Sequence, residues 1–194
     1  GSDRAAALVA GHPDVAVAAI NGPAHVVISG PADPIAACLG DAERAGIAVR
    51  RLEVSHAFHS AMMEPMLDEF AQVTATVSYR EPALPLVSNV SGAVVGRDDV
   101  AQPGYWVDQV RQTVRFADGV QALWDQGCRW FLEMGPSATL TSLARACLAP
   151  AAGCADAPGI FVPSLRRGRS DWAVLSEAAA RLHVSGRHVD WRAW

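Results

Sequence analysis

The sequence predicts a mixed α/β fold of the α+β kind, and three observations support this prediction. Apolar runs of strand length alternate with stretches of helical periodicity along the 194 residues. Glycine and proline, present in 16 and 12 copies, stand between many of these runs, where turns and helix ends are expected. Hydrophobic residues make up 51% of the chain and charged residues 19%, which is the composition of a folded globular protein with a sizeable core.

The N-terminal part of the chain gives the order α-β-β-α-β. The stretch 3–13 has helical character, and the apolar runs 15–20 and 25–29 are predicted strands on either side of the turn "NGP". The stretch 33–46 begins with Asp-Pro and ends with glycine, which is typical of a helix. A third strand is predicted over 47–54. This order matches a ferredoxin-like βαββαβ unit that lacks its first strand.

Predicted helices and strands alternate again through the rest of the chain. Methionine, leucine and phenylalanine recur at helical spacing over 61–74, so this helix should bury one face. Ser137 lies in the turn "GPSAT", where the N-cap of the following helix is expected. Residues 151–159 are mostly small, as in a linker. The further predicted strands are 84–88, 129–134 and 160–163, and the further predicted helices are 103–112, 116–126, 135–148 and 171–184.

The composition narrows the classes of function. The formal charge of −4 gives no support for nucleic-acid binding, and no apolar run approaches the ~20 residues needed to span a bilayer. The chain begins with Gly1-Ser2 rather than methionine, so we expect a tagged protein or an excerpt of a longer one. The cysteines show no CxxC pair, which predicts free thiols in a reducing, cytoplasmic environment. They are Cys38, Cys128, Cys147 and Cys154.

One stretch, "VSHAFHSAMMEP" (residues 54–65), concentrates titratable side chains. His56 and His59 stand three apart beside a phenylalanine, where a strand-like run meets a helix-like run. The pair is compatible with a metal site, a catalytic base, a pH switch or packing without chemistry. A metal site needs further ligands, and Glu53 and Glu64 nearby form no HExxH motif, so we expect no metal.

A histidine base would need a nucleophile on a strained turn, as in GxSxG. No GxSxG occurs in the chain, and the nearest match, around Ser137, suits a helix cap better. If His59 is a base, its nucleophile therefore lies outside this chain. The residues alone leave a structural role for both histidines open.

Five separated stretches occur in one order along the chain: "AAINGPAHVVISGP", "RRLEVSHAFHSAMMEPM", "PLVSNVSG", "YWVDQVRQTVRFADGV" and "FLEMGP". Together they resemble the acyltransferase domain of modular type I polyketide synthases, the malonyl-CoA:acyl carrier protein transacylase family. The trailing "PSLRRGRSDWAVLSEAAARLHVSGRHVDW" resembles the linker that follows such domains. The resemblance covers essentially the whole chain.

The resemblance implies three parts. Residues 1–55 would form the ferredoxin-like small subdomain, 56–150 the C-terminal part of an α/β-hydrolase-like acyltransferase core with the HAFH loop, and 151–194 the post-acyltransferase linker. The family's GHSxG serine, its oxyanion segment and the arginine that pairs with the malonyl carboxylate would all precede Gly1. The chain by itself is therefore expected to be inactive.

The resemblance also implies roles for individual residues. His59 would be the base that takes a proton from the active-site serine, and later helps the carrier-protein thiol to take the acyl group. The backbone carbonyl of Asn89 would orient the His59 ring. His56, Ala57 and Phe58 would read the extender unit, because HAFH accompanies malonyl and YASH accompanies methylmalonyl in this family.

The implied ligands and partners follow from the same resemblance. Malonyl-CoA would be the substrate and the phosphopantetheine arm of an acyl carrier protein the acceptor, with no permanently bound cofactor. The ketosynthase and linker domains of the same synthase would be neighbours, with no nucleic-acid or membrane partner. One departure is Thr113, where the family usually has proline. The alternatives are a non-catalytic ferredoxin-like binding module and a transacylase of fatty-acid synthesis.

Overall fold

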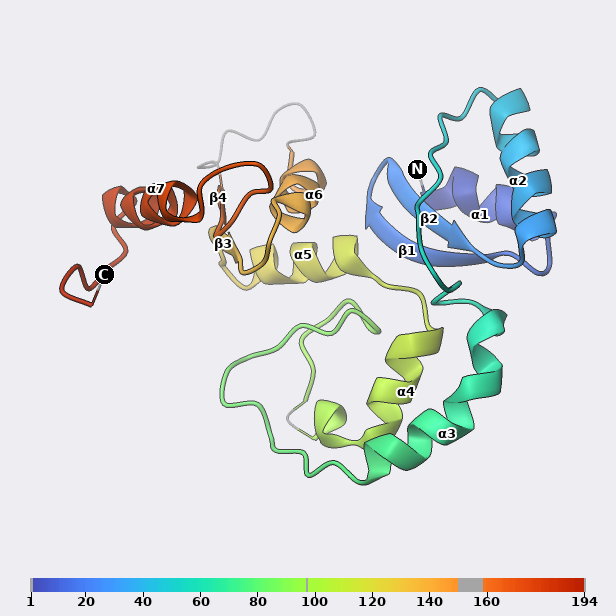
Figure 1. Ribbon diagram of the computed structural model, residues 1–194, viewed down its shortest axis with the longest axis horizontal. Coiled ribbons are helices and arrows are strands. Elements are labelled where there is room, and N and C mark those ends of the chain that lie inside the picture. Colours follow the sequence, from blue (N-terminus) through green and yellow to red (C-terminus); the bar gives the residue numbers. More distant parts are fainter. Residues whose placement is uncertain (1, 97, 150–158, 194) are drawn as a thin grey trace. The chain divides into compact units, whose positions relative to one another are not determined.

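A computed structural model describes residues 2–96, 98–149 and 159–193 (Figure 1). Within these ranges, helices accompany two small sheets of two strands each, which confirms the predicted mixed α/β class. The chain divides into two compact units, Gly1–Leu123 and Trp124–Trp194, which we call unit 1 and unit 2. The three-part division implied by the family resemblance stays a prediction.

Unit 1 begins with a β-hairpin, a helix that packs on it and a second helix that packs on the first. The strands pair antiparallel, and α1 contacts both of them as well as α2. Gly30, directly after the second strand, has to be glycine, because an added Cβ would lie 2.6 Å from the backbone oxygen of Asp14. Cys38 and Ala42 of α2 are almost fully buried. The elements are α1 (Ser2–Ala10), β1 (Ala16–Gly22), β2 (His25–Ser29) and α2 (Ala32–Arg44).

The strand predicted over 47–54 does not form, and this prediction is wrong. The segment has no strand pairing within the described residues, and Leu52 and Val54 are 52% and 71% exposed. An extended segment becomes a strand only where another strand offers backbone partners. β1 already pairs with β2 on one edge, and its other edge bridges in parallel to Val114.

The second half of unit 1 is helical. α3 packs against α4, and an ion pair of 3.0 Å joins Arg111 Nε to Glu64 Oε1. The helix predicted over 61–74 is confirmed, but its buried face is narrower than predicted, because Met63 is buried and Met62 and Val73 are exposed. The elements are η1 (Ala61–Met63), α3 (Glu64–Ala75), η2 (Asp99–Ala101), α4 (Pro103–Arg111) and α5 (Phe116–Asp125).

The strand predicted over 84–88 shrinks to one isolated bridge between Val87 and Val94. The chain turns back after Ser88, whose backbone N–H donates to Ala93 over 2.9 Å. The Ser88 side chain is buried and lies 2.9 Å from the Tyr105 hydroxyl. The turn that follows at "NVSG" comes too early for a longer ladder.

Unit 2 contains a parallel strand pair covered by helices. β3 and β4 pair in parallel, and the rings of Phe131 and Phe161 stack with centroids 5.0 Å apart. α6 packs on both strands and α7 on β4 (Figure 1). Parallel strands require a crossover connection, and α6 lies between them in the sequence. The elements are β3 (Trp130–Glu133), α6 (Thr139–Cys147), β4 (Ile160–Pro163) and α7 (Asp171–Val184).

The start of α6 is capped by Glu133 and not, as predicted, by Ser137. The Glu133 Oε2 atom accepts hydrogen bonds from the backbone N–H and the hydroxyl of Thr141, each at 2.8 Å. Ser137 Oγ lies 3.0 Å from the hydroxyl of Thr139 instead. Burial alone would raise the pKa of Glu133, but the N–H groups at the start of α6 and the Thr141 hydroxyl outweigh it and lower this pKa.

Cys38, Cys128 and Cys147 take part in no disulfide bond. Burial raises the pKa of Cys38 and Cys147, which makes both poor nucleophiles at neutral pH. Cys128 is also free, and Cys154 lies outside the described residues, as does most of the predicted linker 151–159. No helix in the described ranges is long and apolar enough to cross a bilayer.

Candidate active site

His59 occupies a strained position in the HAFH loop, residues 56–59. Its φ is +62°, the left-handed region, and no other non-glycine residue in the described ranges has a positive φ. Such a conformation costs about 1–3 kcal/mol, and it persists only where surrounding contacts hold it. One such contact is the His59 backbone N–H, which donates to the carbonyl of Val110 over 3.0 Å.

The His59 ring is held through one nitrogen. Its Nδ1 lies 2.8 Å from the backbone carbonyl oxygen of Gln112. Because a carbonyl can only accept, Nδ1 carries the proton of the neutral ring and donates it. The lone pair is then on Nε2, and the side chain is only partly buried, so this nitrogen can accept a proton from an incoming group.

Gln112, and not Asn89, therefore supplies the carbonyl that orients the ring. The Asn89 carbonyl instead accepts a hydrogen bond from the backbone N–H of Arg115 over 2.7 Å. This corrects the role implied for Asn89. Every residue type offers a backbone carbonyl, so the side chain at position 112 carries no signal that sequence reasoning could use.

The segment 112–115, which we call the anchor segment, is tied to β1. The Thr113 hydroxyl donates to the carbonyl of Val17 over 2.7 Å. The Val114 N–H donates to Ala18 over 2.9 Å, and the Ile20 N–H donates to Val114 over 2.8 Å. The hairpin of unit 1 thus fixes the peptide that holds the His59 ring.

Ser60 stabilises the loop from the other side. It is fully buried, its hydroxyl donates to the carbonyl of Ala57 over 2.7 Å, and it accepts from the Met62 N–H over 3.3 Å. Ser60 is therefore the N-cap of η1. Sequence reasoning missed this residue, although a serine directly before a helical run is a usual capping signal.

The rings of the HAFH loop form an open cluster. The centroids of His56 and Phe58 are 6.1 Å apart with an edge-to-face angle of 75°, and those of Phe58 and His59 are 6.3 Å apart. Phe58 is 47% exposed and Ala57 is half-buried. His56 Nδ1 lies 3.0 Å from the hydroxyl of Ser55, so the two histidines have separate partners.

Metal ligation finds no support in this geometry. Across the described part of the chain, no three His, Cys, Asp or Glu side chains gather where they could hold a metal ion. What the loop offers chemically is an imidazole that the Gln112 carbonyl orients through Nδ1, beside an exposed phenyl ring.

The sequence profile of one protein family, described as the acyl transferase domain, matches residues 2–189. Polyketide synthase GfsB of Streptomyces halstedii is 45% identical over 180 residues, which make up 92% of this chain and 3% of GfsB. The chain thus spans a small fraction of the curated relatives that it matches.

Two solved structures are similar throughout. The acyltransferase domain from the second module of the salinomycin polyketide synthase has a TM-score of 0.89 at 39% identity, covering 98% of this chain and 44% of that domain. The acyl transferase domain of SpnD, solved in complex with 2-(pent-4-yn-1-yl)malonyl, has a TM-score of 0.87 at 34% identity. The match covers 95% of this chain and 44% of the SpnD domain.

Proposed function

The chain belongs to the acyl transferase domain family, and we propose that it carries the base and the extender-reading loop of a malonyl transferase within a polyketide synthase. The single observation that carries this proposal is the His59 ring, whose Nδ1–H donates to the Gln112 carbonyl and whose Nε2 is left as the basic nitrogen. A general base needs this arrangement, because the tautomer decides which nitrogen accepts the proton.

The proposed reaction is a two-step acyl transfer. A serine outside these residues attacks the thioester carbonyl of malonyl-CoA while His59 Nε2 takes its proton, and the imidazolium then protonates the departing CoA thiolate. In the second step, Nε2 takes the proton of the phosphopantetheine thiol of an acyl carrier protein. That sulfur attacks the acyl-serine ester, and the serine oxygen regains a proton from the imidazolium.

The Gln112 carbonyl would do part of the work of a triad carboxylate. Its partial negative charge lies 2.8 Å from Nδ1 and stabilises the positive imidazolium that forms in both steps. It cannot take the proton away, so the proton stays on Nδ1 and the exchange runs through Nε2 alone.

Selection of the malonyl group is assigned to His56, Ala57 and Phe58. The Phe58 ring is exposed next to the His59 ring, where it would oppose an additional methyl group on the α-carbon of the acyl unit. Residues 1–55, 56–150 and 151–194 are proposed to be the small subdomain, the core part and the post-domain linker. The ketosynthase of the same synthase is the proposed neighbour.

Radiolabelled malonyl-CoA and carrier protein test this function. A complete acyl transferase domain that includes this chain is expected to label its serine and then the carrier protein, whereas the chain by itself should do neither. Labelling of the isolated chain would refute the assignment of the nucleophile to residues outside it. A complete domain that folds but transfers no acyl group would favour a non-catalytic binding module instead.

A further inference from the structure

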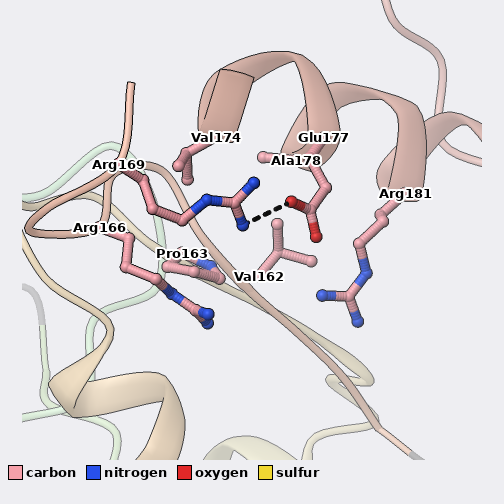
Figure 2. Close-up of a pocket in the computed structure, with 8 residues that line it drawn as sticks. All are labelled: Val162, Pro163, Arg166, Arg169, Val174, Glu177, Ala178 and Arg181. Atoms are coloured by element: carbon pink, nitrogen blue, oxygen red, sulfur yellow. Dashed lines mark hydrogen bonds and ion pairs between the residues drawn. The ribbon is translucent and has the colours of Figure 1, made fainter. Parts of the chain in front are cut away.

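Unit 2 holds a pocket lined by arginine side chains, which the proposed acyl transfer does not use. Its volume is about 260 Å³, and it lies between α6, the end of β4 and α7. The guanidinium groups of Arg145, Arg166 and Arg181 line it, together with Thr141 and Ser142. Figure 2 shows a smaller adjoining pocket, in which Arg166 and Arg181 lie on either side of Val162 and Pro163. The two pockets share Arg166 and Arg181.

Most of this positive charge has no acidic partner among the residues that the structure describes. Arg169, which lines the smaller pocket, forms an ion pair with Glu177 at 3.3 Å (Figure 2). The Arg145 guanidinium lies 5.1 Å from the centre of the Phe161 ring and forms no ion pair with a described residue. Arg166 and Arg181 form no ion pair with any of the described residues. No acidic side chain is among the described residues that line the larger pocket.

The two hydroxyl groups are not free to bind an anion. The Thr141 hydroxyl donates to Glu133 over 2.8 Å, and the Ser142 hydroxyl donates to the Ala138 carbonyl over 2.6 Å. The Glu133 carboxylate is buried and receives the N–H groups at the start of α6, so its charge is already compensated. Donors for a ligand must therefore come from the arginines.

The charge of the whole unit supports this conclusion. By sequence, unit 2 contains 8 arginines against 6 acidic residues, a formal charge of +2, although the whole chain carries −4. Guanidinium groups bind carboxylate and phosphate through two parallel hydrogen bonds, and like charges in one pocket repel one another until an anion enters.

We propose that this pocket binds the phosphate or diphosphate group of a larger ligand. A volume of about 260 Å³ is near the lower limit of small-molecule sites, so it suits a charged group better than a whole cofactor. Three guanidinium groups favour an anion with more than one negative charge. The proposal does not depend on the proposed acyl transfer, because none of these residues belongs to the HAFH loop.

Calorimetric titration of the full chain with pyrophosphate at low ionic strength tests the proposal. The double variant Arg166→Gln/Arg181→Gln should weaken binding about tenfold or more, because each lost bond is charge-assisted. The matched control is Arg50→Gln/Arg51→Gln, which removes two exposed arginines from unit 1 and should change the affinity less than about twofold. Equal losses in both variants, or no saturable binding by the native chain, would overturn it.

NMR of the native chain provides a second measurement that does not depend on the variants folding. Pyrophosphate should shift the guanidinium Nε–H signals of Arg145, Arg166 and Arg181 more than those of Arg50 and Arg51, and an equal response of all five refutes the site. Titrations with CoA, dephospho-CoA, phosphopantetheine and pantetheine then identify the source of the phosphate. Binding of pantetheine as tight as that of phosphopantetheine would also overturn the proposal.

Discussion

The two units of this chain place their candidate chemistry on different parts of the polypeptide. In unit 1, backbone carbonyls hold His59 and the anchor segment. The contact between His59 and Gln112 joins positions that are 53 apart in the sequence, and the contact between Thr113 and Val17 joins positions that are 96 apart. In unit 2, the candidate site consists of charged side chains on neighbouring elements. By sequence, unit 1 contains 8 arginines and 14 acidic residues, a formal charge of −6, against +2 for unit 2. A site that is held by backbone groups depends on how the chain folds, whereas a site that is made of charged side chains depends on which residues the sequence contains.

The largest expected effect tests whether the backbone-held ring is the base. In a complete domain, His59→Ala should lower kcat for acyl transfer by ~10²–10⁴-fold or more, because loss of a general base has this cost. His56→Ala is the matched control, since its ring contacts Ser55 and Phe58 and not the Gln112 carbonyl, and it should mainly change KM and selectivity. Equal losses of kcat in the two variants would show that the roles are assigned wrongly.

The next effect concerns the exposed ring beside the base. His56→Tyr with Phe58→Ser in a complete domain should raise the methylmalonyl-to-malonyl ratio of kcat/KM, because the smaller serine leaves room for one more methyl group. One methyl group is worth ~10–200-fold in discrimination, which sets the upper limit of the change. A competition assay with both CoA esters measures it. An unchanged ratio would exclude residues 56–58 from the choice of extender unit.

A smaller effect tests the link between the hairpin and the ring. Thr113→Val removes the hydroxyl that donates to Val17 and should destabilise unit 1 by about 1 kcal/mol. It should also loosen the Gln112 peptide, so that His59 no longer populates the Nδ1–H tautomer alone. Long-range ¹H–¹⁵N spectra report the tautomer, and denaturant unfolding reports the stability. Thr113→Ser keeps the hydroxyl and should restore both; a native tautomer in Thr113→Val would contradict the link.

The smallest expected effect concerns the stability of unit 2 at acidic pH. The pKa of Glu133 is lowered in the folded chain, so its contribution to stability is present above its unfolded pKa of about 4.3 and is lost as the pH falls through the folded value. Glu133→Gln cannot ionise and should therefore flatten the decline of stability in this acid range. Urea unfolding at a series of pH values, monitored through the signal of Trp130, measures the difference in stability between the native chain and Glu133→Gln. Parallel curves for the two proteins would contradict the capping role.

Local signals predicted much of the fold. Strand β2 coincides with the prediction over 25–29, and α7 coincides with 171–184. These elements have both the right periodicity and a clear turn or cap at each end. The strands predicted over 47–54 and 84–88 failed, because strand formation depends on a partner edge that the local sequence does not specify.

The candidate site was predictable only where side chains carry the chemistry. His56, Phe58 and His59 stand out as titratable and aromatic residues in an otherwise aliphatic stretch. Gln112 does not, because its contribution is a backbone carbonyl, and the family resemblance points to Asn89 instead. The pocket at Arg166 and Arg181 is an intermediate case: the arginines within residues 166–169 are visible in the sequence, but the approach of Arg166 to Arg181 on α7 is not.

The contact between Thr113 and Val17 has a practical consequence for exchanging segments between related acyl transferase domains. A recombination junction placed anywhere between these two positions, which are 96 apart, would combine a hairpin from one parent with an anchor segment from another. The donor and acceptor atoms would then come from sequences that never evolved together, and the mismatch would reach the peptide that holds the ring of His59, the proposed base. Junctions that take both positions from the same parent keep this hydrogen bond between the anchor segment and the hairpin intact.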